Sequence, residues 1–160
     1  MKSLYTELLY NRFTYKNKNR RMKFTSKEKD LTPRELVELE KLYSIKLPKS
    51  YKEFMIKNNG MRPLREYFFK PEIWDNDIEI FNIFSIKYGS TTFEKYNINV
   101  GLDDYPEGKV TIGRSRTGYF SISVRKRDFG NVYVYYSDGE IHKLANSFVE
   151  FLNGFRAVSS

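Results

Sequence analysis

The sequence contains no cysteine and one histidine, His142, among its 160 residues. Disulfide bonds, cysteine nucleophiles and zinc sites of the usual cysteine type are therefore excluded, and so is a disulfide-stapled secreted domain. His142 has no second histidine with which to form a metal-binding pair and no acidic partner at a recognisable spacing. No GxSxG motif is present. These absences favour a binding protein over an enzyme, and we expect no catalytic residue, metal or cofactor.

Long apolar runs are also missing. No window approaches the ~20 apolar residues of a membrane span. The first residues, MKSLYTELLYNRF, include Glu7 and Arg12 and lack the apolar run of a signal peptide. We therefore expect a cytoplasmic protein without membrane contact. Aromatic rings are plentiful, because the chain has 13 tyrosines and 13 phenylalanines. That number is enough to close a core and to leave tyrosines for a binding surface.

Positive charge is unevenly distributed along the chain, whose formal net charge is +8. Residues 1–31 carry nine basic and three acidic side chains, a net charge of +6, whereas residues 32–160 carry 19 basic and 17 acidic side chains, a net +2. The segment KNKNRRMK at residues 16–23 is either a contact for phosphates or an acidic partner, or a solvated linker. The near-neutral body argues against a whole domain that binds nucleic acid.

Two helix starts and a glycine stop fall within residues 31–60. Thr32 with Pro33 and Glu35 has the pattern of an N-cap, a first-turn proline and a capping box. The first helix should bury Leu36, Leu39, Leu42 and Tyr43. Leu47-Pro48 predicts a corner, because the residue before proline is pushed out of the helical region. A second helix should begin with Pro48 and bury Tyr51, Phe54 and Met55. Asn59-Gly60 predicts its left-handed cap.

The flanking segments complete the predicted fold. Residues 3–13 predict a short amphipathic helix, followed by a basic linker at 14–30. Residues 61–77 look irregular, and residues 78–86 predict a strand. A short helix at 90–96 and an acidic loop at 101–108 should follow.

A β-meander is predicted next, with strands at 109–112, 119–125 and 131–136. The Asp138-Gly139 turn leads to a fourth strand at 140–143. Ser147 and Glu150 predict a capping box for a last helix that stops near Gly154. We expect one domain over residues 1–160 with its core at 31–154. Its class is α+β, with N-terminal helices and a C-terminal helix packed around a twisted, mainly antiparallel sheet.

Several patterns resemble metal-binding, acid/base or phosphate-binding motifs, but their residues or spacing do not match. The carboxylates Asp75, Asp77 and Glu79 begin like a calcium loop, but Ile80 stands where that loop needs glycine and Ile86 where it needs glutamate. The loop carboxylates Asp103, Asp104 and Glu107 are expected to be solvated rather than to form an acid/base pair. The run GRSRTG at 113–118 has the spacing of neither phosphate-binding motif.

The sheet residues leave two alternatives open. RTGYFSI at 116–122 loosely matches an RNA-recognition pattern that Thr117 interrupts. Tyr119, Tyr133 and Tyr135 are either stacking partners for bases or ordinary sheet residues. The run Arg125-Lys126-Arg127 either meets an acidic patch on a partner or keeps a polar loop soluble.

The ordered set of motifs resembles the SUKH superfamily, which includes the yeast cell-wall assembly regulator. Residues 39–60 are similar to the family pattern ExxL…LPxxYxxFLxxxNG. VTIG at 110–113 is similar to IPIG, and ANSFVEFL at 145–152 is similar to ia.SFeeFL. The resemblance covers residues 31–152. The chain departs from it at Met61, where a second glycine often follows, and at Thr111, which replaces the proline of IPIG.

The resemblance implies an α+β fold in which helices pack around a twisted sheet. It also implies an immunity protein that neutralises a bacterial toxin domain, of nuclease or deaminase type, by stoichiometric binding. Other members are protein-interaction modules. The motif residues are expected to be scaffold: Glu40, Leu47, Pro48, Tyr51, Phe54, Asn59, Gly60, Ile112, Gly113, Gly118, Ser147, Phe148 and Phe151.

Partner contacts are expected from aromatic and arginine side chains, which are the usual hot spots of interfaces. The candidates are Trp74, Tyr88, Tyr105, Arg114, Arg116, Tyr119, Arg125 and Arg127. Inhibitors of basic nucleases are usually acidic, so the charge predicts an acidic target surface or a largely aromatic and apolar contact. The alternative hypothesis is a nucleic-acid-binding or general protein-interaction module that uses the basic arm at 1–24 and the tyrosine-rich sheet. Nucleic-acid affinity would fall steeply with salt. The sequence specifies no oligomeric state.

Overall fold

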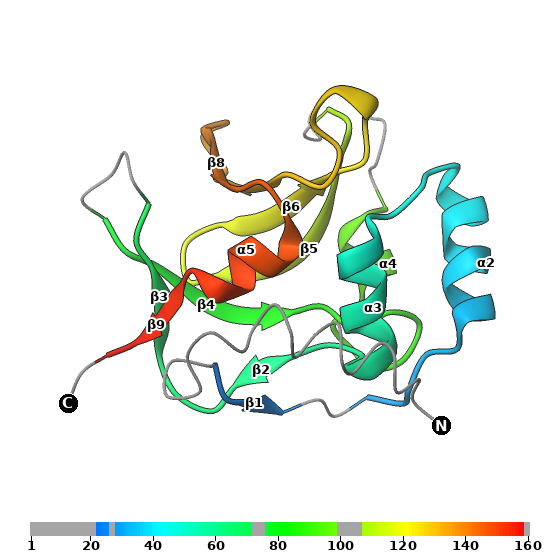
Figure 1. The fold of residues 1–160 in the computed structure, drawn as a ribbon, viewed down its shortest axis with the longest axis horizontal. Helices are drawn as coiled ribbons and strands as arrows, with labels where there is room; N and C mark the ends of the chain where they lie inside the picture. The colour runs from blue at the N-terminus through cyan, green and yellow to red at the C-terminus, as the bar shows by residue number, and fades with distance from the viewer. Residues whose placement is uncertain (1–21, 26–27, 72–75, 99–106, 159–160) are drawn as a thin grey trace.

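The computed structural model describes residues 22–25, 28–71, 76–98 and 107–158. Within them a seven-stranded antiparallel sheet forms the centre, in the strand order β8-β7-β6-β5-β4-β3-β9 (Figure 1). Its strands are β3 (Tyr67–Phe69), β4 (Ile78–Ile83), β5 (Lys109–Ser115), β6 (Tyr119–Ser123), β7 (Val132–Tyr135), β8 (Ile141–Ala145) and β9 (Phe155–Ala157). A separate pair joins β1 (Phe24–Thr25) to β2 (Arg62–Pro63).

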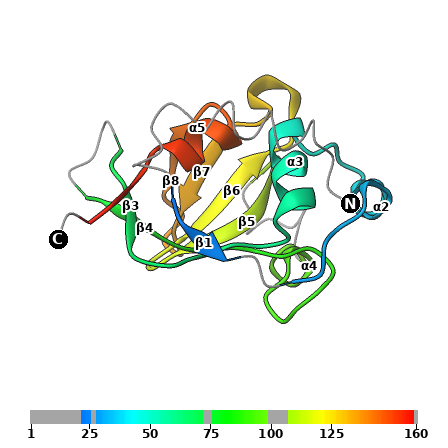
Figure 2. The same ribbon diagram turned by 60° about the horizontal axis from the view of Figure 1, so that its bottom comes forward.

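Helices cover one face of this sheet and its end. They are α2 (Pro33–Tyr43), α3 (Lys49–Lys57), α4 (Phe93–Tyr96) and α5 (Phe148–Asn153). Figures 1 and 2 show α5 lying across the sheet with α3 beside it, whereas α2 is outermost. The predicted α+β class with a mainly antiparallel sheet is confirmed. The predicted helix at 3–13 lies outside the described residues, and the short strands β1, β2, β3 and β9 were not predicted.

The core lies between α3, α5 and the covered face of the sheet. Phe148 is fully buried, and its ring centroid lies 5.3 Å from that of Tyr51 and 5.1 Å from that of Phe54. Phe151 meets Phe120 of β6 at 4.9 Å. Ring pairs at these separations add about 0.5–1.5 kcal/mol each beyond the area they bury. The motif aromatics of α3 and α5 therefore fasten the two helices to each other and to the sheet.

The buried face of α2 differs from the predicted stripe. Leu36 and Leu39 are buried, but Leu42 is 72% exposed. Glu40 is buried instead, because on a helix it lies between Leu36 and Tyr43 and Leu42 projects to the side. Its carboxylate accepts a hydrogen bond from the Leu47 backbone N–H at 2.7 Å. Glu40 therefore holds the corner between α2 and α3.

The helix ends agree with the sequence pattern in part. The capping box of Thr32 and Glu35 is formed, with donor–acceptor distances of 3.2 and 3.0 Å. Pro48 is the N-cap of α3 rather than its first helical residue. The second box is half formed: Ser147 accepts from the Glu150 N–H at 3.1 Å, but the Glu150 carboxylate bonds the N–H of the residue before Ser147.

Asn59 joins three segments of the chain. Its side-chain nitrogen donates to the carbonyls of Lys29 at 2.8 Å and Ile86 at 2.9 Å, and its oxygen accepts from the Ile86 N–H at 2.7 Å. The predicted left-handed cap at Asn59-Gly60 is wrong, because α3 ends at Lys57 with Asn58 as an extended C-cap. Gly60 does adopt a left-handed φ of +88°, and a Cβ there would lie 3.1 Å from the Ser85 backbone.

We predict that Asn59→Ala lowers the free energy of unfolding by about 3 kcal/mol, because it leaves buried backbone groups at Lys29 and Ile86 unpaired. Urea denaturation would measure the loss. Asn58→Ala is the matched control, since the side-chain nitrogen of Asn58 has no hydrogen-bond partner among the described residues, and it should cost less than about 1 kcal/mol. Equal losses in the two variants would contradict this role for Asn59.

Candidate protein-interaction face

The sheet face opposite α5 carries polar and aromatic side chains in register. Across β5, β6, β7 and β8, one row aligns Arg114, Tyr119, Tyr135 and Ile141. A second row aligns Thr111, Ser121, Tyr133 and Lys143. Residues paired across strands point to the same side of a sheet. We define the tyrosine face as Tyr96, Arg114, Tyr119, Tyr133, Tyr135, Ile141 and Lys143. The row of Arg114, Tyr119, Tyr135 and Ile141 is called the central row.

The central row is extended by a chain of rings. Tyr135 stacks on Tyr119 with ring centroids 5.4 Å apart, and Tyr119 meets Tyr96 of α4 at 6.0 Å. Tyr96 stacks in turn on Phe84 at 4.1 Å, and Phe84 is fully buried. The half-exposed tyrosines are thus held in place by the core. Rings fixed in this way lose little conformational entropy when a partner binds.

Polar contacts fix the ends of this chain of rings. The Tyr135 hydroxyl lies 2.9 Å from the Thr111 hydroxyl, and burial raises the pKa of Tyr135. Arg114 places its Nη1 atom 3.5 Å from the Tyr96 hydroxyl. Arg114 follows Gly113, whose Cα faces the Asn82 carbonyl so closely that a Cβ would clash with it. The glycine of the VTIG motif therefore lets β4 and β5 approach and sets the position of Arg114.

Asn97 holds Tyr96 against the sheet. Asn97 is buried, and its side-chain nitrogen donates to the carbonyls of Phe93 and Thr111, both at 2.8 Å. Its oxygen accepts from the Thr111 N–H at 2.7 Å. The single-turn helix α4 is thereby fastened to β5. Sequence reasoning missed both Tyr96 and Asn97, because a four-residue helix gives little periodic signal.

One end of the tyrosine face is organised by Asp128. Its carboxylate takes two bonds from the Arg125 guanidinium, at 2.8 and 3.0 Å, and one each from the hydroxyls of Ser123 and Tyr133, both at 2.5 Å. The Arg125 guanidinium, together with the two hydroxyls, holds the pKa of Asp128 well below its usual range. Arg125 is therefore engaged within its own loop, whereas Arg127 is exposed.

A groove of about 900 Å³ lies at the other end of the strands. Arg116 lines it, with its Nε atom 2.8 Å from the Glu79 carboxylate. The remaining lining residues are Phe68, Asn76, Asp77, Ile78, Thr117, Tyr136, Ser137, Asp138 and Glu140. A volume of this size suits a segment of a partner as well as a small molecule.

Tyr88 lies apart from this face, near the start of α2. Its hydroxyl donates to Glu35 at 2.6 Å, and Lys87 lies 2.9 Å from the same carboxylate. These bonds, that of Tyr88 first, lower the pKa of Glu35 from 4.5 to about 2. The amines of Lys29 and Lys87 also lie 5.0 and 5.5 Å from the centre of the Tyr88 ring. Tyr88 is thus tied to the scaffold by these contacts.

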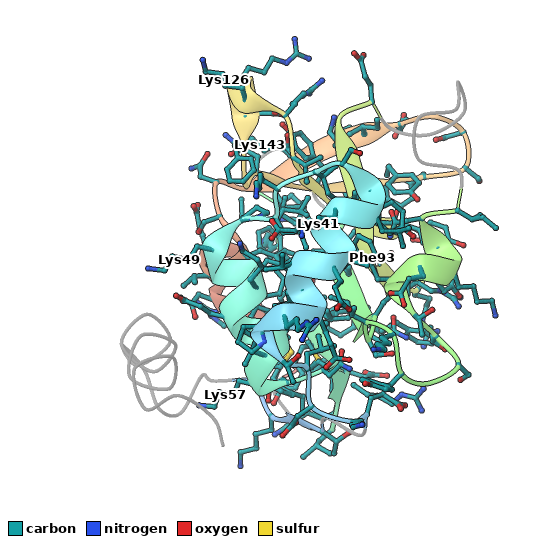
Figure 3. The ribbon with its side chains drawn as sticks, turned by 90° about the vertical axis from the view of Figure 1, so that its right-hand side faces the viewer. Lys41, Lys49, Lys57, Phe93, Lys126 and Lys143 are labelled. Carbon is teal, nitrogen blue, oxygen red and sulfur yellow. The ribbon has the colours of Figure 1, made fainter. Side chains whose placement is uncertain are left out.

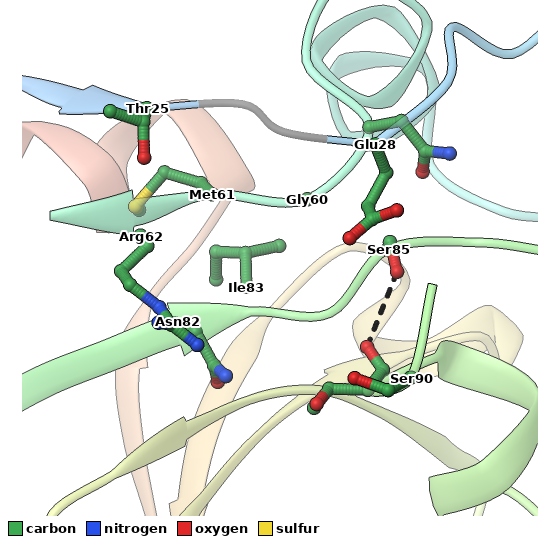
Figure 4. A pocket seen from close by; sticks show the side chains of 11 residues that line it. Thr25, Glu28, Gly60, Met61, Arg62, Asn82, Ile83, Ser85 and Ser90 are labelled. Atoms are coloured by element: carbon green, nitrogen blue, oxygen red, sulfur yellow. Dashed lines mark hydrogen bonds between the residues drawn. The ribbon is translucent and has the colours of Figure 1, made fainter. Parts of the chain in front are cut away.

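A smaller polar pocket of about 120 Å³ lies beside Gly60 (Figure 4). Ser85 closes one side of it by donating to the carbonyls of Tyr88 at 2.7 Å and Thr91 at 3.3 Å. The Asn82 side-chain oxygen in its lining has no hydrogen-bond partner. The pocket is smaller than the ~300 Å³ at which ligand sites usually begin, and a few water molecules would fill it.

The predicted contact residues therefore fall in separate places. Arg114 and Tyr119 lie on the central row, Arg125 and Arg127 at one end of the tyrosine face, and Arg116 at the other. Trp74 and Tyr105 lie outside the described residues. Over the described ranges, no group of three or more histidine, aspartate or glutamate side chains could hold a metal ion. No helix in that part of the chain is long and apolar enough to cross a membrane.

Fold and face together define an α+β domain with helices on one side of a sheet and a fixed row of rings on the other. The chain belongs to the SMI1 / KNR4 family (SUKH-1), whose sequence model matches residues 30–154. The uncharacterized protein YnaB of Bacillus subtilis (strain 168) is 31% identical over 107 residues. That match spans 67% of this chain and 60% of the YnaB protein.

The Glu35 site generates a pH prediction. Because the folded pKa of about 2 lies below the ordinary 4.5, the carboxylate stabilises the fold above pH 4.5 and this contribution is lost as the pH falls toward 2. We expect Glu35→Gln to be less stable than the parent protein at pH 7, and the difference to shrink between pH 4.5 and 2 in urea titrations. The control is Glu38→Gln, whose exposed ion pair with Arg34 spans 3.5 Å and should matter little at any pH. A Glu35→Gln deficit that does not change with pH would refute the assignment.

Proposed function

We propose that this protein is an immunity protein that binds a bacterial toxin domain of nuclease or deaminase type and blocks it stoichiometrically. The tyrosine face is the contact surface in this proposal. The protein acts by occupying the toxin's surface, and no side chain of its own performs catalysis. Membership of the SMI1 / KNR4 family supports a protein partner, because the SUKH superfamily that this chain resembles also includes protein-interaction modules.

The observation that carries the proposal is the fixed row of rings with an arginine at its end. Tyrosine and arginine are enriched at binding hot spots. Here Tyr119 and Tyr135 are held by stacking at 5.4 Å and Arg114 lies beside them in register. The row is preorganised, so most of the ordering that binding requires is already present in the free protein. Burial of such a row under a partner would supply affinity without any reacting group.

If the neighbouring gene encodes a toxin domain, the direct test is rescue of cells from that toxin. Co-expression with that toxin should restore growth, and titration of the purified pair should reach an end point at one immunity protein per toxin. Continued killing at matched protein levels would refute the assignment for that pair. Toxin that is inactivated by a substoichiometric amount of this protein would refute the non-enzymatic mechanism.

We predict that Tyr119→Ala weakens toxin binding at least thirtyfold, which corresponds to about 2 kcal/mol at a hot spot. Calorimetry would measure the change. Tyr119→Phe should retain most of the affinity, because it keeps the ring that stacks on Tyr135. Val37→Ala is the matched control, since Val37 is 47% exposed on the outer helix α2. If Tyr119→Ala and Val37→Ala bind the toxin equally well, the contact lies elsewhere.

A further inference from the structure

The two ends of the tyrosine face carry opposite charge. Strand order places the turns at 116–118 and 136–140 at one end, because they close the β5–β6 and β7–β8 hairpins. The loop between β6 and β7, at 124–131, lies at the other end. We call the groove carboxylates Glu79, Asp138 and Glu140 the acidic end. The basic end consists of Lys109, Lys126, Arg127 and Lys143.

The acidic end has more negative charge than its single arginine can offset. Among the described residues that line the groove, Arg116 is the one cation, and it is bound to Glu79 at 2.8 Å. Asp138 and Glu140 are exposed, and the Asp138 carboxylate is fixed by the Glu140 N–H at 2.9 Å. Burial raises the pKa of Tyr136, and the charges of Glu140 and Asp138 raise it further. Both carboxylates line the same groove as Tyr136.

Asp77 is not counted in the acidic end. It lines the groove but also a neighbouring hollow of about 530 Å³ together with Lys70 and Arg156. Lys70 and Arg156 are the cations on that side. The negative charge at the turn rests on Asp138 and Glu140, and the Glu140 carboxylate lies 3.3 Å from the Nε2 atom of His142.

The basic end is the counterpart. Arg125 binds the Asp128 carboxylate beside this end with two hydrogen bonds. Lys126 and Arg127 are exposed on the short turn that these bonds stabilise. Figure 3 shows Lys126 and Lys143 at the same end of the molecule.

Lys109 lies near the same positive charges. It is 6% exposed, with its amine 4.6 Å from the centre of the Tyr133 ring. Burial lowers the pKa of Lys109, and the charge of Arg125 lowers it further. The charges of Asp128 and Glu107 act in the opposite direction and raise the pKa of Lys109.

The two ends do not neutralise each other. The five residues of β6 separate the turn at 116–118 from the loop that carries Lys126 and Arg127, a span of about 16 Å at ~3.3 Å per residue. That distance exceeds the Debye length of about 8 Å at physiological ionic strength. Each end therefore presents its own sign of charge to a partner. The central row, in which Tyr119 begins β6 and Tyr135 ends β7, lies directly beside the acidic end.

We propose that the tyrosine face docks a protein that presents basic side chains to the groove and acidic side chains to Lys126, Arg127 and Lys143. The central row meets an apolar patch of that protein. This inference deepens the proposed function, because it specifies the charge pattern that the toxin's contact surface must carry. A nucleic acid laid along the face would bring phosphates against Asp138 and Glu140, which like-charge repulsion disfavours.

The charge pattern is tested with two synthetic peptides, deca-arginine and deca-glutamate, in 0.1 M salt. Two-dimensional NMR should show that deca-arginine shifts amide signals at 77–79, 116–118 and 136–140. Deca-glutamate should shift those at 109, 124–128 and 143. If both peptides shift the same signals, or if deca-arginine prefers another part of the described surface, the proposal is overturned.

Reciprocal charge reversals sharpen this test. The variant Asp138→Lys with Glu140→Lys should weaken deca-arginine binding at least tenfold and leave deca-glutamate binding unchanged. Lys126→Glu with Arg127→Glu should do the opposite. Glu38→Lys on the exposed side of α2 is the control for net charge and should change neither affinity more than twofold. Equal losses of both peptides in both variants would show a general charge effect and overturn the proposal.

An oligonucleotide separates a protein partner from nucleic acid. Twelve-residue oligo(dT) should shift only signals at the basic end. If it also shifts Tyr96, Tyr119 and Tyr135, the face binds single-stranded nucleic acid and the proposal fails.

The toxin domain tests the natural partner. Each double reversal should slow its association at least tenfold at low salt, because complementary charge acts mainly on the association rate. A toxin that binds with unchanged rates overturns the charge pattern and leaves the immunity function standing. A toxin that does not bind at all counts against the immunity function for that pair, whereas the peptide results still decide the charge pattern.

Discussion

The fold depends on one buried amide, that of Asn59. Its three hydrogen bonds connect the segment before α2, the end of α3 and the chain that follows β4. Both backbone partners at Ile86 are satisfied by the same side chain, so the register of that segment is set relative to α3. The adjoining Gly60 lets the chain turn where a Cβ would press on Ser85. The position of β4, and hence of the sheet built on it, follows from this junction.

The sequence was sufficient for elements whose signals are local. The capping box at Thr32, the meander at 109–143 and the last helix each have residues whose preferences act within a few positions. The short strands could not be predicted from the sequence, because β3 and β9 are three residues each and form only by pairing with distant parts of the chain. Leu42 was expected in the buried stripe of α2 but is exposed, and Glu40 is buried beside Leu36 and Leu39. An apolar pattern cannot show that the corner at Leu47 needs a buried acceptor.

The candidate face was predictable in its composition but not in its assembly. Arg114 and Tyr119 were singled out as arginine and aromatic residues, and the register puts them side by side. Their neighbour Tyr96 comes from a four-residue helix whose place is set by Asn97. Arg125 shows that residue type alone does not identify a contact residue. It has the residue type of a hot spot, yet its guanidinium is bound to Asp128, three residues further along the chain.

Net charge is a poor guide to what this protein binds. The +2 of residues 32–160 is an average over surfaces that differ in sign. Antiparallel hairpins separate those signs, because they bring alternate turns to opposite ends of a sheet. Asp138 and Glu140 therefore lie with the β5–β6 turn, while Lys126 and Arg127 lie a strand's length away. Over that distance screening makes each cluster act alone. A near-neutral domain can in this way offer a partner two charged contacts of opposite sign, and the order of the hairpins decides where they lie.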